Sequence, residues 1–364
     1  MMNKKKIIIF MPSIEGGGVE KNFFIISNYL SKKFDNISII TISKIHKNKL
    51  DKKIKLISVD PEIFDKFGRR LKFFISIYYL FKEIFKNKHA TVFCFQGIFY
   101  CTVFCKLFST KIIIRSNSSP SGWSKNIIKN YLYKLVYGWA DIIIVNSLEF
   151  KKEFLKKFNL NSVCIYNPLN KNEILKNSKK NVKISFFTSE SYKIISVARF
   201  AEQKDHECLV KAIKLLKDKY KIKLLLLGSG PTRTKIEKLI EDLRLKNYIQ
   251  IIAFKKNPYP FIKKSDLFIL SSKYEGLPNS LLEAIVLNKP VISSNCPTGP
   301  NEILDKGKGG LLFAVGDHKS LANKIEQFIK SKNQIAQKRK YAYKRLYRFD
   351  YKLRLYDYYK VICS

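Results

Sequence analysis

The sequence has few of the residues that build metal sites and disulfide frameworks. It contains four His and seven Cys in 364 residues, and no two Cys form a Cys-x-x-Cys pair. A zinc site is therefore not expected, and the odd, scattered Cys set argues against a disulfide framework. We expect reduced thiols, as in a cytosolic protein.

Acidic residues are also scarce. The chain has 29 Asp and Glu against 69 Lys and Arg, a formal net charge of +40. Such a charge favours anionic partners, namely nucleic acid, an acidic membrane or phosphorylated substrates. The chain is also rich in Lys, Asn, Ile, Phe and Tyr, which is typical of AT-rich coding sequences. Part of the positive charge is therefore attributed to codon bias and not to function.

Long apolar runs are missing as well. The start, MMNKKKIIIFMPSIEGGG, has Lys before an apolar run, but this run is too short for the h-region of a signal peptide. The most apolar window, Thr91–Cys105, is shorter than a membrane span and contains Gln96-Gly97 in its middle. We expect a buried strand and a buried helix there.

What the sequence does contain is a regular alternation of short apolar runs and helical patterns. Length and an apolar content of 46% fit two globular domains. Strands alternating with helices predict parallel, doubly wound sheets that bind ligands at the carboxyl ends of the strands. The predicted strands are 6–10, 37–41, 55–59, 91–95, 111–114, 141–145, 163–166, 193–197, 223–227, 249–253, 266–270 and 290–293.

The alternation is interrupted once. Residues 170–190 are rich in Lys, Asn and Ser and lack a periodic apolar face. This predicts a first domain over 1–168, a linker over 169–191 and a second domain over 192–347. A last helix, within 348–364, has aromatic residues on one face and is expected to pack back on the first domain.

The most informative stretch is Ser271–Ala284, SSKYEGLPNSLLEA. A predicted strand ends at Leu270, a turn follows, and a helix is expected to begin with Ser280 as N-cap and Glu283 in a capping box. A helix N-terminus suits a phosphate. The carboxylates of Glu275 and Glu283 beside it could accept hydrogen bonds from sugar hydroxyls.

EGLPNSLLEA resembles the signature of family-4 retaining glycosyltransferases of the GT-B fold, also called glycosyl transferases group 1. The resemblance implies an α/β protein with two Rossmann-like doubly wound domains facing across a cleft. It places Glu275 by the donor sugar and Glu283 on the ribose hydroxyls. Backbone amides of the same stretch would meet the diphosphate, at Gly276, Leu277, Asn279, Ser280 and Leu281. Taken alone, Glu283 could be a capping residue and Glu275 a solvated turn residue.

Three other strand ends correspond to positions of the family pattern, two of them by matching it and one by departing from it. Arg199 and Lys204 correspond to the basic residues that grip the donor diphosphate, where Arg supplies a bidentate fork and Lys a point charge. Phe254 and Lys256 follow a strand at a position where the family usually has Gly. In the family this position lies near the nucleotide base, so the departure leaves the identity of the base undecided. Gly228-Ser229-Gly230-Pro231 resembles a structural glycine-proline turn.

The first domain carries weaker signals. Gly17 and Gly18, in a Gly-Gly-Gly turn between strand and helix, would approach the donor phosphate or the acceptor, although the dinucleotide spacing is missing and a plain glycine turn is the alternative. Many family members have a His where this chain has Phe95-Gln96-Gly97. Gln96, Arg115 and Asn117 are the acceptor-side candidates, and no catalytic residue is assigned in this domain.

The resemblance predicts an enzyme that moves a hexosyl or N-acetylhexosaminyl group, with retention, from a nucleotide diphosphate to a lipid-linked or cell-surface saccharide. Uridine is the favoured nucleotide and a GDP-mannose-type donor the alternative. No metal or cofactor is expected, because the second half has no Asp-x-Asp at a strand end. The alternatives are an inactive membrane scaffold or a nucleic-acid-binding module, but no helix-turn-helix, RNA-recognition or zinc pattern occurs.

The segment Arg69–Lys88, RRLKFFISIYYLFKEIFKNK, predicts a basic amphipathic helix rich in aromatic residues. Its composition is typical of a helix that lies on a membrane surface. We therefore expect electrostatic, salt-reversible docking of the first domain on an anionic membrane, with the protein peripheral on the cytoplasmic face. A core helix with solvated lysines is the alternative.

Overall fold

The computed structural model describes residues 3–14, 17–42, 47–58, 69–123, 126–187 and 190–364. The chain divides into two compact units. Unit 1 comprises Met1–Pro168 and Lys352–Ser364, and unit 2 comprises Leu169–Tyr351. None of the helices in the described ranges combines the length and hydropathy that a bilayer-crossing segment requires.

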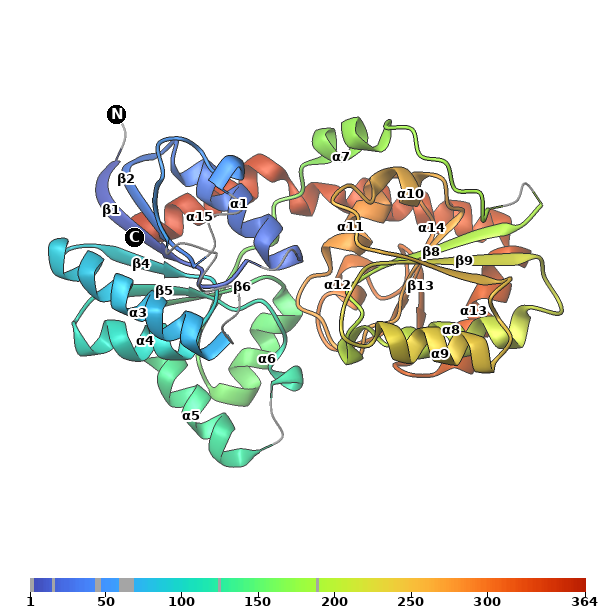
Figure 1. Ribbon diagram of the computed structural model, residues 1–364, viewed down its shortest axis with the longest axis horizontal. Helices are drawn as coiled ribbons and strands as arrows, with labels where there is room; N and C mark the ends of the chain where they lie inside the picture. The colour runs from blue at the N-terminus through green and yellow to red at the C-terminus, as the bar shows by residue number, and fades with distance from the viewer. Residues whose placement is uncertain (1–2, 15–16, 43–46, 59–68, 124–125, 188–189) are drawn as a thin grey trace. The chain divides into compact units, whose positions relative to one another are not determined.

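Unit 1 is built on a seven-stranded parallel sheet with the order β3-β2-β1-β4-β5-β6-β7 (Figure 1). The strands are β1 Asn3–Phe10, β2 Phe34–Ile40, β3 Lys55–Ile57, β4 Thr91–Cys94, β5 Lys111–Arg115, β6 Ile142–Val145 and β7 Val163–Cys164. The helices are α1 Gly18–Leu30, α3 Arg69–Lys86, α4 Ile98–Leu107, α5 Ile127–Gly138, α6 Leu148–Phe158 and α15 Tyr351–Cys363. Short 3-10 helices lie at Lys47–Lys49 and Pro120–Gly122.

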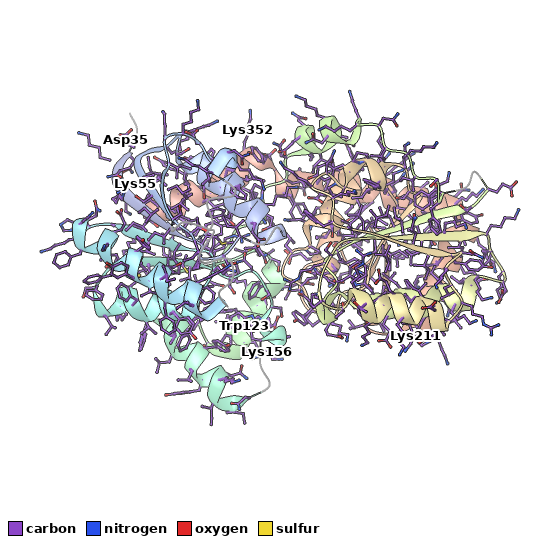
Figure 2. All side chains as sticks on the ribbon, in the orientation of Figure 1. Asp35, Lys55, Trp123, Lys156, Lys211 and Lys352 are labelled. Atoms are coloured by element: carbon purple, nitrogen blue, oxygen red, sulfur yellow. The ribbon has the colours of Figure 1, made fainter. Side chains whose placement is uncertain are left out.

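One face of this sheet is covered by α3, α4, α5 and α6. A single apolar cluster joins inward residues of the strands to Leu80 of α3, Cys101 of α4, Tyr137 of α5 and Phe154 of α6. Trp123, labelled in Figure 2, closes this layer by packing its ring against α5 and α6, with Phe158 stacked 5.7 Å away. Right-handed crossovers that all step in one direction along the sheet place these helices on one side.

The C-terminal helix α15 packs in unit 1 although the preceding residues belong to unit 2. Lys5 donates to the carbonyl of Ile362 at 2.9 Å, and the Phe34 and Tyr359 rings lie 5.5 Å apart. The Tyr358 side chain is completely buried. Both termini therefore lie beside β1 (Figure 1).

Unit 2 repeats the architecture with a six-stranded parallel sheet of order β10-β9-β8-β11-β12-β13. The strands are β8 Tyr192–Val197, β9 Ile222–Leu227, β10 Ile249–Ile252, β11 Leu267–Leu270, β12 Val291–Ser294 and β13 Leu311–Phe313. The helices are α7 Lys171–Ser178, α8 His206–Leu216, α9 Arg233–Asp242, α10 Tyr259–Lys263, α11 Asn279–Val286, α12 Pro300–Ile303, α13 His318–Lys330 and α14 Lys332–Lys344. Short 3-10 helices occupy Glu202–Lys204 (η3) and Arg345–Phe349 (η4).

The prediction of two doubly wound α/β domains is confirmed, and two local predictions need correction. The predicted linker contains helix α7, which buries Ile174 and packs on α10 and α11 within unit 2. Two turns with one buried apolar residue are too short to show periodicity. Strand β13 was not predicted, because its three residues give no alternation to detect.

Candidate functional site

The most polar constellation of unit 2 lies at the reversal of its strand order. The chain runs from β8 outward to β10 and then returns to β11 on the other side of β8. Parallel sheets bind ligands at the carboxyl ends of the strands beside such a reversal. The loops that follow β8 and β11 carry Lys204 and Glu275, respectively.

Lys204 and Glu275 form an ion pair. The Lys204 Nζ lies 2.5 Å from Glu275 Oε1, and the side chains are 20% and 8% exposed. A pair so shielded from water is stronger than a surface pair. Residues 71 apart in the chain thus place one cation and one carboxylate together at the sheet reversal.

Glu275 is held by a set of hydrogen bonds to its side chain and backbone. The Ser272 hydroxyl donates to Oε1 at 2.6 Å, and the Thr298 hydroxyl donates to the Glu275 carbonyl at 2.6 Å. Gly299, with φ of 86°, follows, and a Cβ there would lie 2.5 Å from the carbonyl oxygen of Gly276. The loop after β12 therefore locks the loop after β11, and only glycine allows this close approach.

The N-cap of helix α11 lies two residues earlier than predicted. The first residue of the helix is Asn279 and its N-cap is Pro278, so Ser280 lies inside the first turn. The predicted capping box of Ser280 and Glu283 is wrong, because proline occupies the cap and has no side-chain oxygen to offer. Gly276, Leu277 and Leu281 are buried, while Asn279 and Ser280 are half-buried, so any ligand contact at Leu281 involves its backbone amide.

Glu283 lies in the second turn of α11, with only 6% of its surface exposed. Its Oε1 accepts a hydrogen bond from the Tyr259 hydroxyl of α10 at 3.4 Å. A carboxylate at this depth needs polar partners. The neighbouring helix α10 therefore supplies one of its hydrogen-bond partners.

Three further predicted residues lie at exposed positions beyond the carboxyl ends of strands in the same sheet. Arg199 follows β8, and Phe254 and Lys256 follow β10. The Phe254 amide donates to the Ser229 hydroxyl at 3.0 Å, which joins the loops after β9 and β10. In the loop after β9, a Cβ on Gly228 would lie 1.9 Å from the Ala198 carbonyl oxygen, next to Arg199.

The corresponding reversal in unit 1 lies between β1 and β4. Gln96 accepts from the Ser13 amide at 2.9 Å and so ties the two loops together. Gly17 and Gly18 are exposed at the start of α1, and Glu20 stands in the first turn. This carboxylate opposes anion binding at the helix terminus. Gly16, the first glycine of the turn, lies outside the described residues.

Arg115 does not face an acceptor, contrary to the prediction. Its side chain is completely buried and donates to Tyr358 Oη at 2.8 Å and to Asn167 Oδ1 at 2.7 Å, as well as to Asn117. Asn117 in turn donates to the Phe95 carbonyl at 3.1 Å. Both residues therefore anchor α15 and the loop after β4, a role that strand-end position alone does not reveal.

The described residues contain no group of three or more His, Cys, Asp or Glu side chains arranged to hold a metal ion. Residues 177–345, which include every donor-side candidate of unit 2, match the family model described as "Glycosyl transferases group 1". The match covers somewhat less than half of the chain, so it is this segment that resembles the family.

Curated relatives agree with the assignment. An uncharacterized glycosyltransferase of Methanocaldococcus jannaschii is 36% identical over 54% of this chain and 51% of its own length, so the chain spans about half of that relative. The Campylobacter jejuni N-acetylgalactosamine-N,N'-diacetylbacillosaminyl-diphospho-undecaprenol 4-alpha-N-acetylgalactosaminyltransferase is 26% identical over 87% of this chain and 88% of that protein. The Rhizobium meliloti lipopolysaccharide core biosynthesis glycosyltransferase LpsE is 32% identical over 37% of this chain and 39% of its own.

Solved structures agree on the fold. The Anabaena protein HepE in complex with UDP and glucose superposes with a TM-score of 0.80 at 17% identity, covering 99% of this chain and all of that one. Sucrose-phosphate synthase from Thermosynechococcus elongatus gives 0.81 at 15% identity, covering 98% of each chain. The chain therefore has the GT-B fold of two Rossmann-like domains.

The sequence analysis did not identify several residues that shape the candidate site. Ser272 is three residues before Glu275 and could have been found from that spacing, whereas Thr298 and Tyr259 come from distant segments. Buried Cys296 lies near Glu275, and burial together with that negative charge raises the pKa of its thiol to about 12. The thiol therefore stays protonated at neutral pH.

His206, which opens α8 beside Lys204, was also missed. Its ring stacks on Phe200 with centroids 4.3 Å apart and is almost completely buried. Neither ring nitrogen has a hydrogen-bond partner. Burial, and then the positive charge of Lys204, lower the pKa of His206 from 6.5 to about 4. It is therefore a neutral imidazole at pH 7, packed under the loop that carries Lys204.

Proposed function

We propose that this enzyme transfers a hexosyl or N-acetylhexosaminyl group from a nucleotide diphosphate, with uridine as the favoured nucleotide, and retains the anomeric configuration. The observation that carries the proposal is the shielded Lys204–Glu275 pair at the strand reversal of unit 2, in the loop that leads into α11. In the reaction the bond from the sugar C1 to the diphosphate oxygen breaks and a bond from C1 to the acceptor oxygen forms. The acceptor proton passes to the leaving phosphate.

The chemistry that this constellation offers is neutralisation of negative charge. As the sugar leaves, charge grows on the diphosphate, and preorganised cations and helix amides stabilise it most where water is excluded. Lys204, exposed Arg199 and the α11 N-terminus are the groups we assign to this role. With these groups in place, the reaction needs no metal ion.

Glu275 and Glu283 receive different roles because their surroundings differ. Glu275 is paired with a cation, and we assign it to the donor sugar, where its carboxylate orients hydroxyls and faces the developing positive charge at C1. Glu283, in the second turn of α11, accepts a hydrogen bond from the hydroxyl of Tyr259. We assign it to the ribose hydroxyls, which can donate two hydrogen bonds to one carboxylate.

The acceptor we propose is a lipid-linked or cell-surface saccharide. The support is the activity for which two relatives are named, transfer to a diphospho-undecaprenol-linked saccharide and lipopolysaccharide core biosynthesis. Such acceptors are anchored in a membrane, so we place the enzyme at the cytoplasmic face of a membrane as a peripheral protein.

A donor screen tests the proposal. Hydrolysis of UDP- and GDP-sugars is measured for the wild-type enzyme and for Glu275→Gln, and the anomeric configuration of the transferred sugar is followed by NMR. We expect turnover with a UDP-sugar, retained configuration and strong loss in Glu275→Gln. Turnover with GDP-mannose and with no UDP-sugar would show that the donor nucleotide is guanosine diphosphate. Inverted product, or an unaffected Glu275→Gln variant, would overturn the proposed mechanism.

A further inference from the structure

The outer sides of α3, α4 and α5 expose an unusual number of large apolar side chains. On α5, Ile127 and Ile128 are 85% and 71% exposed, and on α3 Phe85 is 70% exposed. We call the full set the α3–α5 surface. It comprises Leu71, Phe74, Tyr78, Phe81, Phe85, Tyr100, Leu107, Phe108, Ile127, Ile128, Tyr131 and Leu132.

These side chains belong to one continuous layer. The helices α3, α4 and α5 lie next to one another on the same face of the unit 1 sheet (Figure 1). Ring contacts join α3 to α4, with the Phe81 and Phe108 centroids 5.5 Å apart and those of Phe73 and Tyr100 6.1 Å apart. A further contact, between Phe99 and Tyr133, joins α4 to α5. Contiguous apolar patches of this extent mark interaction sites.

The charge of the α3–α5 surface has one sign. The three helices contain a single carboxylate, Glu83, which is 4% exposed and faces Lys6 and Lys55 of the sheet at 3.6 and 3.1 Å. The exposed charges on and directly after these helices are lysines, namely Lys82, Lys86, Lys88, Lys106, Lys129 and Lys134. The side chains of Arg69 and Arg70 lie outside the described part of the structure.

We propose that the α3–α5 surface inserts its apolar side chains into the interface of an anionic lipid bilayer, with the lysines at the level of the lipid phosphates. The inference rests on the membrane location proposed above and adds the surface and its mode of binding. Aromatic and aliphatic residues framed by lysines are the composition of a membrane-interface surface. A second copy of the chain is disfavoured as the partner of this surface, because a twofold-symmetric contact would place lysines against lysines.

This mode of binding differs from the one that the sequence predicts. The sequence pointed to α3 alone and to electrostatic docking that salt reverses. Apolar contacts are not screened by salt, so the structure predicts binding that salt weakens without abolishing. The tip of α5, with the most exposed apolar pair, should contribute as much as α3.

Vesicle co-flotation of the full chain tests the inference. Vesicles of phosphatidylcholine alone and of phosphatidylcholine with phosphatidylglycerol are compared at about 0.1 M and about 0.5 M salt. The test variant is Ile127→Asp with Ile128→Asp, two positions exposed enough for folding to be unaffected. The matched control is Leu215→Asp with Val315→Asp, which changes two exposed apolar residues of unit 2.

We expect the wild type to bind anionic vesicles and to retain measurable binding at high salt. The Ile127/Ile128 variant should bind roughly 100-fold more weakly, about tenfold for each apolar side chain, and the control should bind like the wild type. Donor hydrolysis should be unchanged in both, so a failed membrane test leaves the proposed chemistry unaffected. Unchanged flotation of the Ile127/Ile128 variant would overturn the inference. A wild-type dimer that this variant dissociates would instead assign the surface to self-association.

Discussion

The two units of this protein share one architecture and differ in the loops that follow their central strands. In unit 2 the loops after β8 and β11 bring Lys204 and Glu275 into an ion pair. In unit 1 the equivalent loops after β1 and β4 are joined by a hydrogen bond from the Ser13 amide to Gln96. The same sheet reversal thus carries a shielded ion pair in unit 2 and a hydrogen bond between uncharged groups in unit 1. The fold supplies the place, and the loop residues supply the chemistry.

The outer surfaces of the units also differ. The described residues of unit 1 include the twelve large apolar side chains of the α3–α5 surface, whereas exposed apolar residues of unit 2, such as Leu215 and Val315, stand on separate elements. We propose that the units divide the work: unit 2 would bind the charged donor, and unit 1 would meet the lipid surface where the acceptor is anchored. The following predictions test this division, from the largest effect to the smallest.

Removing the cations of unit 2 should have the largest effect. Lys204→Ala and Arg199→Ala should each lower kcat by roughly 100- to 1,000-fold and raise KM much less, because their contacts strengthen as charge develops on the diphosphate. Steady-state kinetics measure the split. Lys235→Ala, which removes an exposed lysine of unit 2 near Glu202 and Glu207, is the control. Effects confined to KM would show uniform binding of ground and transition states.

Glu283→Ala should abolish most donor binding while the protein stays folded. Loss of charged hydrogen bonds to two ribose hydroxyls should cost roughly 2–4 kcal/mol, or about 30- to 1,000-fold in affinity. Calorimetric titration with the nucleotide measures the change, and Tyr259→Phe, which removes only the neighbouring hydroxyl, should cost less. Unchanged affinity with a large drop in Tm would assign Glu283 a structural role.

The glycine turns of the two units should tolerate a methyl group very differently. In Gly228→Ala the new Cβ would lie 1.9 Å from the Ala198 carbonyl oxygen, so we expect a loss of roughly 3 kcal/mol in unfolding free energy. In Gly17→Ala the nearest atom is the movable end of Glu20 at 2.9 Å, so the change should stay within about 1 kcal/mol. Denaturant titration compares the two, and equal effects would contradict the close approach at β9.

Protonation of His206 should destabilise the enzyme at mildly acidic pH. Its folded-state pKa of about 4 is lower than the ordinary 6.5, so the unfolded state binds the proton more tightly. Stability from this group is complete above pH 6.5 and falls by up to roughly 3 kcal/mol as pH drops towards 4. His206→Phe should flatten this part of the pH–stability curve, and His89→Phe in unit 1 should not. An unchanged curve in His206→Phe would rule out the buried neutral imidazole.

Chelation should have the smallest effect. If Lys204 and Arg199 neutralise the diphosphate, turnover should be the same with and without EDTA. Complete loss of activity, restored by magnesium or manganese, would show that the diphosphate is held through a metal ion.

Local patterns were enough to predict the sheets because buried parallel strands are continuous apolar runs, as in Leu267–Leu270. Patterns failed for the short elements α7 and β13. They also failed at the start of α11, where the neighbouring residue Pro278 occupies the N-cap. The assignment of Arg115 failed for a related reason. Its position after a strand is that of a ligand-binding residue, but α15 returns from the end of the chain and covers it with Tyr358.

The sequence by itself determined the two doubly wound domains, the family and the stretch Ser271–Ala284, because alternation and local motifs act between residues close in the chain. The tertiary structure decided which of the polar residues meet. Glu275 obtains Lys204 and Thr298 from other loops, and Glu283 obtains Tyr259 from another helix. It also decided that the apolar sides of α3, α4 and α5 form one surface, since adjacency between helices depends on the order of the strands beneath them.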